Sequence, residues 1–178
     1  MNVMTDMQEL IEAPLSREEL AVRYRDLCSD PTYNRVPGKI EIDVWGRLVM
    51  TPPSFYHGRL QGRVIQALGA LAGGEVMAET AIATAAGVFV ADVTWASDSF
   101  VQAHINQVAL EKAPEICVEV VSPSNSRKEI DEKTAAYLAA GAQEVWLVYL
   151  KSKRCDLFGP QGQLEQSAFP VDLSNLFK

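Results

Sequence analysis

Two carboxylates interrupt apolar stretches that are otherwise typical of buried strands. Asp92 stands within "VFVADVTWA" and Glu119 within "EICVEVV". An ionised carboxylate without a partner is costly to desolvate, so each acid needs a cation, a set of donors or a metal ion. If the two strands are neighbours, the acids could share one Mg²⁺ ion, which binds carboxylate oxygens and keeps several waters for chemistry. The open alternative is that each acid lies at a wet strand end and takes no part in chemistry.

A cation could join these acids from the segment that follows Glu119. Lys133 lies on the helix predicted there, and Tyr137 lies one turn further along the same face. An ammonium group in that position could hold an attacking water, or offset charge that builds on a phosphoryl group in the transition state. The alternative is a solvated helix, because Glu129 and Lys133 stand at i and i+4 in the order that stabilises a helix surface.

The segment from 114 to 150 predicts the elements that carry these residues. Its first strand, "EICVEVV", is nearly continuous in apolar residues, as is typical of a central strand buried on both faces. Ser126 and Glu129 then cap a helix that Gly141 ends, and "EVWLVYL" is a second strand of the central kind. A strand, a helix and a strand in this order indicate a parallel crossover unit.

The rest of the chain predicts two more helices and several shorter strands. A helix begins at Ser16 in "LSREELAVRYRDLCSD", and a second runs from about His57 to Leu71, closed by Gly73 and Gly74. Two short strands flank a turn near Trp45, and "EVMAETAIAT" and "VFVADVTWA" form a hairpin. Residues 98–113 are expected to be a loop with a short helical turn, and "RCDLF" an edge strand. We therefore expect an α/β fold, in which one mixed sheet is flanked by helices.

Composition indicates one globular domain over residues 1–178, long enough to form a core without disulfides. The net charge of -7 argues against a surface that coats nucleic acid nonspecifically, although a local basic cleft stays open. Three widely spaced cysteines show no zinc-ligand or disulfide pattern, and the N-terminal residues lack the pattern of a secretion signal. No stretch approaches the length of a membrane span. A reduced, cytoplasmic setting fits these features.

The same segment carries a resemblance to a known family. Residues 114–158 are strongly similar to the Uma-two family of small restriction endonucleases, a branch of the PD-(D/E)xK nuclease superfamily, and residues 40–95 are more weakly similar. The shared pattern comprises Glu119, Val120, Ser122, Pro123, Ser124, Lys133, Tyr137, Gly141, Glu144 and Trp146. The resemblance implies a restriction-endonuclease-like fold and a metal-dependent phosphodiesterase.

The resemblance also implies roles for individual residues. The superfamily's first acid falls on Asp92 and its second on Glu119, and Mg²⁺ or Mn²⁺ would bridge these acids and the scissile phosphate. The superfamily's lysine should follow two residues after the second acid, but Val121 stands there. In this family the role falls on Lys133, whose long stem can reach the same point from the next helix. Ala91 replaces the proline that usually precedes the first acid.

Further residues are candidates for metal or substrate. Glu79 or Glu41 could add a third carboxylate, and Glu79 ranks first because its strand is expected to pair with that of Asp92. His57 resembles a residue that family members often have at that helix start, where it could contact phosphate or be only a local polar contact. Ser122, with backbone amides nearby, could receive a phosphate, and Tyr137 is also expected at the substrate. The alternative for the serine-rich turn is ordinary helix capping.

Three functions fit these observations. The first is a metal-dependent endonuclease acting on DNA, for which a homodimer is expected, because duplex cleavage by this superfamily commonly needs two active sites. The second is a catalytically inactive member that binds nucleic acid or protein, which the acidic balance and the missing lysine beside Glu119 favour. The third is a hydrolase for a small phosphorylated metabolite. A duplex nuclease should have a positive rim near its cleft, for which the candidates are Arg59, Arg63, Arg127 and Lys128.

Overall fold

The structure is a computed structural model that describes residues 13–35, 38–52 and 54–178. The prediction about an N-terminal secretion signal falls largely on residues 1–12, outside the described residues. The helices are α1 (Arg17–Ser29), the 3-10 helix η1 (Pro31–Arg35), α2 (Phe55–Leu68), α3 (Asp98–His104) and α4 (Arg127–Ala139). The strands are β1 (Lys39–Asp43), β2 (Leu48–Thr51), β3 (Gly74–Thr84), β4 (Gly87–Ser97), β5 (Ile116–Val121), β6 (Glu144–Tyr149), β7 (Arg154–Gly159) and β8 (Gly162–Leu164).

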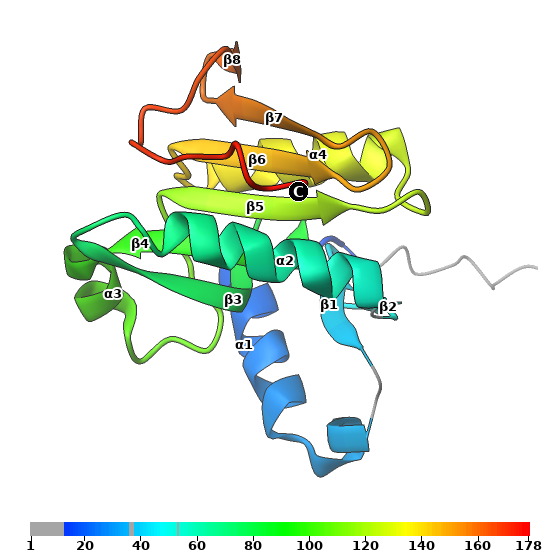
Figure 1. Ribbon diagram of the computed structural model, residues 1–178. Helices are drawn as coiled ribbons and strands as arrows, with labels where there is room; N and C mark the ends of the chain where they lie inside the picture. The colour runs from blue at the N-terminus through cyan, green and yellow to red at the C-terminus, as the bar shows by residue number, and fades with distance from the viewer. Residues whose placement is uncertain (1–12, 36–37, 53) are drawn as a thin grey trace, which may run out of the picture.

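The strands form one mixed eight-stranded sheet in the order β2-β1-β4-β5-β6-β7-β8, with β3 paired to β4 (Figure 1). β5 and β6 are parallel and joined through α4, as the crossover pattern predicts. The other neighbouring strands run antiparallel, including the β3–β4 hairpin. The predicted fold class, a mixed sheet flanked by helices, is confirmed.

Two strands, β1 and β5, pair with the same edge of β4 at different positions along it. The other edge of β4 pairs with β3 from Gly74 to Thr84, so β1 and β5 must share the remaining edge. β1 pairs there with Gly87 and Val88, whereas β5 pairs from Val93 onwards. Residues 89–92 therefore lie where β1 and β5 diverge, and we call this stretch the sheet fork. Backbone groups in such a fork lose their ladder partners and need side chains to replace them.

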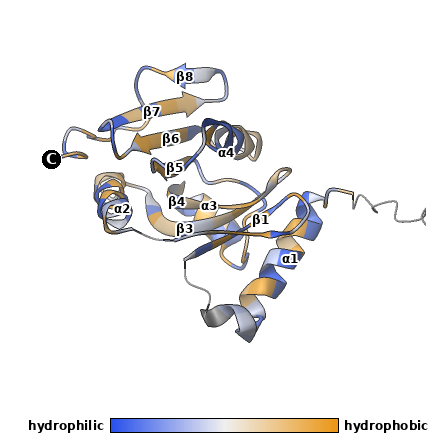
Figure 2. Cartoon of the chain, turned by 90° about the vertical axis from the view of Figure 1, so that its right-hand side faces the viewer, coloured by the Kyte–Doolittle hydropathy of each residue, from blue (hydrophilic) through white to orange (hydrophobic). Residues whose placement is uncertain are grey.

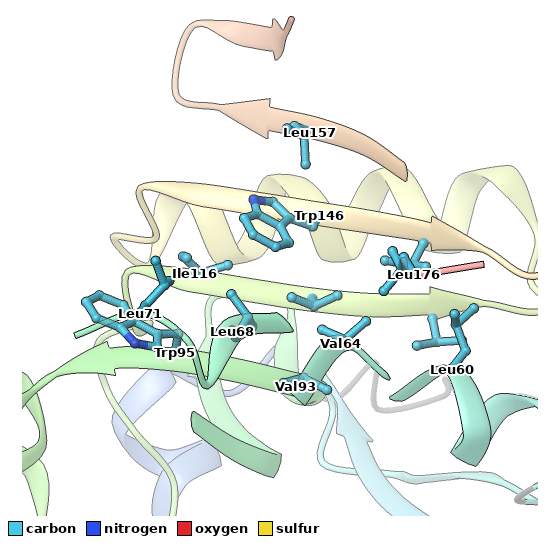
Figure 3. Close-up of a cluster of buried hydrophobic side chains, with 13 residues drawn as sticks. Leu60, Val64, Leu68, Leu71, Val93, Trp95, Ile116, Trp146, Leu157 and Leu176 are labelled. Carbon is cyan, nitrogen blue, oxygen red and sulfur yellow. The ribbon is translucent and has the colours of Figure 1, made fainter. Parts of the chain in front are cut away.

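Helices cover both faces of the sheet beside this fork. α2 packs Leu60, Val64 and Leu68 over one face, in a cluster with Trp95 and Trp146 (Figure 3). α4 packs Tyr137 on the opposite face, and Figure 2 shows α2 and α4 on opposite sides of β5 and β6. The alternation of β5 sends Val118 and Val120 toward α2, and Cys117 and Val121 toward α4. Glu119 shares the α4 side, where Tyr137 donates a hydrogen bond to it, and this explains how an acid can stand within a strand of core residues.

Residues 165–178, which follow β8 and are called the C-terminal segment, complete the apolar core that packs against α2. Leu176 joins the same apolar cluster, and Phe169 meets Trp95 edge-on with ring centroids 5.4 Å apart. The buried carboxylate of Glu144 fixes the segment, accepting hydrogen bonds from Ser167 Oγ at 2.8 Å and from Ala168 N at 2.7 Å. The segment therefore belongs to the same hydrophobic core as α2.

Some predicted boundaries were wrong. α2 spans Phe55–Leu68, because Ser54 caps it through a hydrogen bond from His57 N and Gly69 already ends it. Gly74 begins the next strand instead, and Gly73 lies in the bend before it. The strand "RCDLF" is not at the edge, since β8 pairs outside it. Within residues 13–35, 38–52 and 54–178, no helix combines the length and apolarity that crossing a bilayer requires.

Candidate active site

Asp92 lies in the sheet fork and is almost completely buried, with 1% of its surface exposed. Its Oδ2 accepts a hydrogen bond of 2.7 Å from the backbone N of Val120 on β5. Its Oδ1 accepts one of 2.8 Å from Lys39 Nζ and lies 3.3 Å from His57 Nε2. The carboxylate thus joins β4 to β5 and is held by partners from β1, β5 and α2.

Glu119 approaches the same point from β5. Its Oε1 accepts a hydrogen bond of 2.6 Å from the hydroxyl of Tyr137 on α4. Its Oε2 lies 3.6 Å from Lys133 Nζ and 4.0 Å from Lys39 Nζ. Since Lys39 Nζ also contacts Asp92, the two acids converge on one cation.

Glu41 and Lys39 from β1 fill the sheet fork from the other side. Glu41 Oε1 accepts hydrogen bonds of 2.8 Å from Val90 N and from Lys133 Nζ. Lys39 Nζ donates to Val90 O at 2.7 Å. Both backbone groups of Val90, which have no strand partner in the fork, are therefore satisfied by charged side chains. This explains why such polar groups are tolerated in the interior.

Helix α2 contributes one titratable side chain, His57, and one neutral side chain, Gln61, beside Asp92. His57 and Gln61 stand one turn apart, and Gln61 Nε2 donates to Asp92 O at 2.7 Å and to Glu79 Oε1 at 3.0 Å. Glu79 on β3 has a left-handed conformation, with φ of 53°, and its neighbours Ala78 and Thr80 pair with the residues on either side of Asp92. Non-glycine residues rarely adopt this conformation. The Glu79 side chain is exposed and held by Gln61, so the structure does not bring it into the contacts that Asp92 makes with Lys39.

These groups line a cleft of about 690 Å³. Its wall includes Lys39, His57, Gln61, Glu79, Asp92, Glu119, Lys133 and the turn from Ser122 to Asn125. Within that turn, Ser122 N donates to Asn125 Oδ1 at 2.9 Å, and Asn125 N donates to Ser122 O at 3.0 Å. These two amides are therefore engaged in the turn itself, and Ser126 caps α4 as expected.

Burial and charge act against each other on the pKa values of the acids. Burial raises the pKa of Glu119, although the ammonium groups of Lys133 and Lys39 oppose this shift. At Asp92 the effect of burial is outweighed by the hydrogen bond with His57 and by the charge of Lys39, which lower its pKa to about 2. Asp92 is thus a carboxylate at neutral pH.

The two lysines of the site are held in their charged forms. Burial alone would lower the pKa values of Lys39 and Lys133, but Glu119 and the other carboxylates outweigh it and raise both. The hydrogen bond with Asp92 raises the pKa of His57. Both lysines are therefore ammonium groups at neutral pH, which suits them to donate and not to accept protons.

The donor set suits a hard divalent cation. The described residues hold no cluster of three or more His, Cys, Asp or Glu side chains arranged for a metal. Mg²⁺, however, is typically held by one or two carboxylates, with waters and substrate oxygens completing its shell. Asp92 and Glu119 offer this arrangement, since both face the single ammonium of Lys39.

The structure brings together most of the residues singled out from sequence. Asp92, Glu119, Lys133, Tyr137 and His57 form one contact network. Ser122 lies in the cleft wall, and Glu41, ranked behind Glu79, belongs to the buried network.

Sequence reasoning missed Lys39. A usable signal was the i, i+2 spacing of Lys39 and Glu41 on one predicted strand, which puts both on one face. The expected positive rim is only partly available: Arg59 and Arg63 donate to backbone carbonyls of the C-terminal segment, and Arg127 pairs with Asp131.

The forked sheet, the two flanking helices and the acidic cleft define a restriction-endonuclease-like fold. The sequence matches the Uma2 family, described as "Putative restriction endonuclease", over residues 23–176, and the chain belongs to this family. A solved structure of a "putative nuclease belonging to DUF820" from Anabaena variabilis ATCC 29413 is similar, with a TM-score of 0.62 and 15% sequence identity. The alignment covers 89% of this chain and 84% of that chain, and at this identity the likeness shows the fold alone. No curated protein matches significantly. The family and fold predicted from the sequence are thus confirmed.

Proposed function

We propose that this protein is a metal-dependent endonuclease that hydrolyses phosphodiester bonds of DNA, with Mg²⁺ or Mn²⁺ as cofactor. The observation that carries the proposal is the convergence of Asp92 and Glu119 on one cation position beside Lys133, at the wall of an open cleft. Membership of a family described as restriction endonucleases supports the same reading.

Asp92 and Glu119 would hold the metal. When bound, the ion would supply a polarised water and neutralise charge on the phosphate. The protein's own contribution begins with orientation: Val120 N fixes Asp92 Oδ2, and the Tyr137 hydroxyl fixes Glu119 Oε1. The remaining oxygens, Asp92 Oδ1 and Glu119 Oε2, face the cation position. Both acids are therefore preorganised before substrate arrives.

Lys133 would act as an electrostatic donor. Its ammonium is held by Glu41 and lies 3.6 Å from Glu119 Oε2, at the boundary between the buried network and the cleft. Phosphoryl transfer depends mainly on positioning and on offsetting charge at the phosphoryl oxygens. A lysine whose pKa is raised can supply that charge but cannot serve as a general base at neutral pH.

The substrate is expected at the cleft wall. His57, beside Asp92, and Ser122, in the turn after β5, are proposed to contact the DNA backbone, and Tyr137 acts from beneath through Glu119. The net charge of -7 makes nonspecific attraction to DNA weak, so binding would depend on this local surface. Cleavage of both strands of a duplex would need two such sites, which a homodimer would provide.

The test is cleavage of supercoiled plasmid and of single- and double-stranded oligonucleotides, with and without Mg²⁺ or Mn²⁺. We expect metal-dependent cleavage by the native protein, and a loss of about 100-fold or more in Asp92→Asn and in Glu119→Gln. The matched control is Asp98→Asn, an acid at the start of α3, outside the cleft, which should cleave as the native protein does.

Two outcomes would contradict the proposal. One is cleavage that survives in Asp92→Asn, which would point to a contaminating nuclease. The other is a native protein that cleaves no substrate with either metal. Because Asp92 also joins β4 to β5, circular dichroism and thermal melting must show that each variant is folded before its activity is compared.

A second candidate is a catalytically inactive module that binds nucleic acid or protein. The observation that favours it is the pairing of both lysines with the site's carboxylates, which nearly neutralises the network without a metal. This candidate predicts no cleavage and no calorimetric heat with Mn²⁺, together with retained binding of a partner.

A further inference from the structure

We propose that Lys39 is a built-in competitor of the metal: its ammonium group occupies the cation position between Asp92 and Glu119, and a divalent ion binds only when that ammonium moves away. This inference rests on the metal centre of the proposed function and names a residue that regulates it.

The contacts of Lys39 carry the argument. Its Nζ lies 2.8 Å from Asp92 Oδ1, 4.0 Å from Glu119 Oε2 and 3.8 Å from Glu41 Oε1. A cation shared by the two proposed metal ligands must face those same two carboxylates. A second full positive charge beside the Lys39 ammonium would be strongly repelled at such distances. The ammonium and the metal therefore compete for one place.

The charges of the network lead to the same conclusion. Three carboxylates, those of Glu41, Asp92 and Glu119, face two ammonium groups, which leaves one negative charge in excess. A divalent ion added to this set would reverse the sign of a largely buried network. If one ammonium leaves, the remaining ammonium and the divalent ion together balance the three carboxylates, so the network stays close to neutral.

Of the two lysines, Lys39 is the one whose ammonium group can move away from the carboxylates. Lys133 lies on α4, is 7% exposed, packs over the ring of Phe89 and holds the buried carboxylate of Glu41. Lys39 begins β1, and although both lysines line the cleft, its side chain is the more exposed of the two, at 14% against 9% for Lys133. A lysine stem is flexible, so the ammonium can leave Asp92 and Val90 for the cleft without movement of the strand.

The experiment compares Mn²⁺ binding by the native protein, Lys39→Met and Lys39→Arg, using calorimetry and the electron paramagnetic resonance signal of free Mn²⁺. Lys39→Met removes the competing charge and keeps the apolar stem, so it should bind Mn²⁺ about tenfold more tightly or better. Lys39→Arg keeps the charge and should bind no more tightly than the native protein. Asp92→Asn should abolish binding in each background.

The outcomes separate this inference from the proposed function. Binding by the native protein that is not tightened in Lys39→Met would overturn the competition and leave the metal centre intact. If neither protein binds Mn²⁺, the metal centre itself is absent and both proposals fail. Thermal melting provides the second readout: Mn²⁺ should raise the Tm of Lys39→Met more than that of the native protein. A Lys39→Met protein that is unfolded with and without Mn²⁺ would also overturn the inference, because the ammonium would then be an obligatory part of the fold.

Discussion

Tyr137 links the core beneath α4 to the candidate site through one hydroxyl group. The ring is fully buried and meets Phe89 edge-on. The hydroxyl group donates a hydrogen bond of 2.6 Å to Glu119 Oε1. Tyr137→Phe would keep the packing but leave a carboxylate oxygen without its donor. We expect the free energy of unfolding to fall by about 1–3 kcal/mol, measured by urea denaturation, and cleavage to fall with it.

The matched control is Tyr56→Phe, because Tyr56 is 65% exposed. Its free energy of unfolding should change by less than about 0.5 kcal/mol. Equal stability of Tyr137→Phe and the native protein would show that Glu119 does not depend on this hydroxyl.

Among individual residues, the sequence predicted those that interrupt an apolar pattern with a charge. Asp92 and Glu119 could be found because each is an acid in a strand of core residues. Lys133 was a candidate from its place on the following helix, and the family resemblance then assigned it the role of the superfamily's lysine. Lys39 stands at the start of a short strand whose pattern, "KIEID", looks like an ordinary half-exposed edge. Lys39 gains its partners only where β1 meets the gap in β4, and the i, i+2 spacing of Lys39 and Glu41, which puts both on one face, does not reveal which residues those partners are.

Helix α4 carries Lys133 and Tyr137, so its position sets both. Its N-terminus is capped by Ser126, whose Oγ accepts a hydrogen bond of 3.2 Å from Glu129 N. Ser126→Ala should lower the free energy of unfolding by about 1 kcal/mol, measured by chemical denaturation, because one helix N–H loses its acceptor. Ser152→Ala, in the exposed turn between β6 and β7, is the control and should be nearly neutral. A Ser126→Ala protein as stable as this control would contradict the capping role.

The elements themselves were largely predictable where capping and periodicity agreed. The capping box at Ser16 and the cap at Ser126 marked α1 and α4 correctly. The ends of α2 differ from the predicted ones by two or three residues, because apolar residues at helical spacing continue to Leu71 although Gly69 already ends the helix. β8 was missed because three residues at a turn carry no period.

At the scale of the whole molecule, the C-terminal segment packs across the hydrophobic core and covers part of it. Leu176 is 3% exposed and packs in the apolar cluster against α2 (Figure 3). Helix α2 also carries His57 and Gln61, which line the cleft. Leu176→Ala should therefore lower the free energy of unfolding by about 2–3 kcal/mol, and the Tm with it, through the cavity that it leaves.

Leu48→Ala provides the comparison, because Leu48 on β2 is 41% exposed. The same truncation at that position should cost less than about 0.5 kcal/mol. If both substitutions cost the same, the segment does not contribute to the core. The packing of this segment could not be read from the sequence, since "FPVDLSNLF" has neither length nor period to indicate its partner.

The sheet fork has a consequence for how such a protein tolerates change. Enzymes commonly gain stability when polar active-site groups are replaced, because those groups are kept for activity at the expense of the fold. Here Glu41 and Lys39 complete the hydrogen bonds of Val90, and Asp92 joins two strands. In this protein, replacing these polar groups should therefore lower the stability of the fold and not raise it. Natural or engineered variants that lose activity by substitution at these positions should also be less stable.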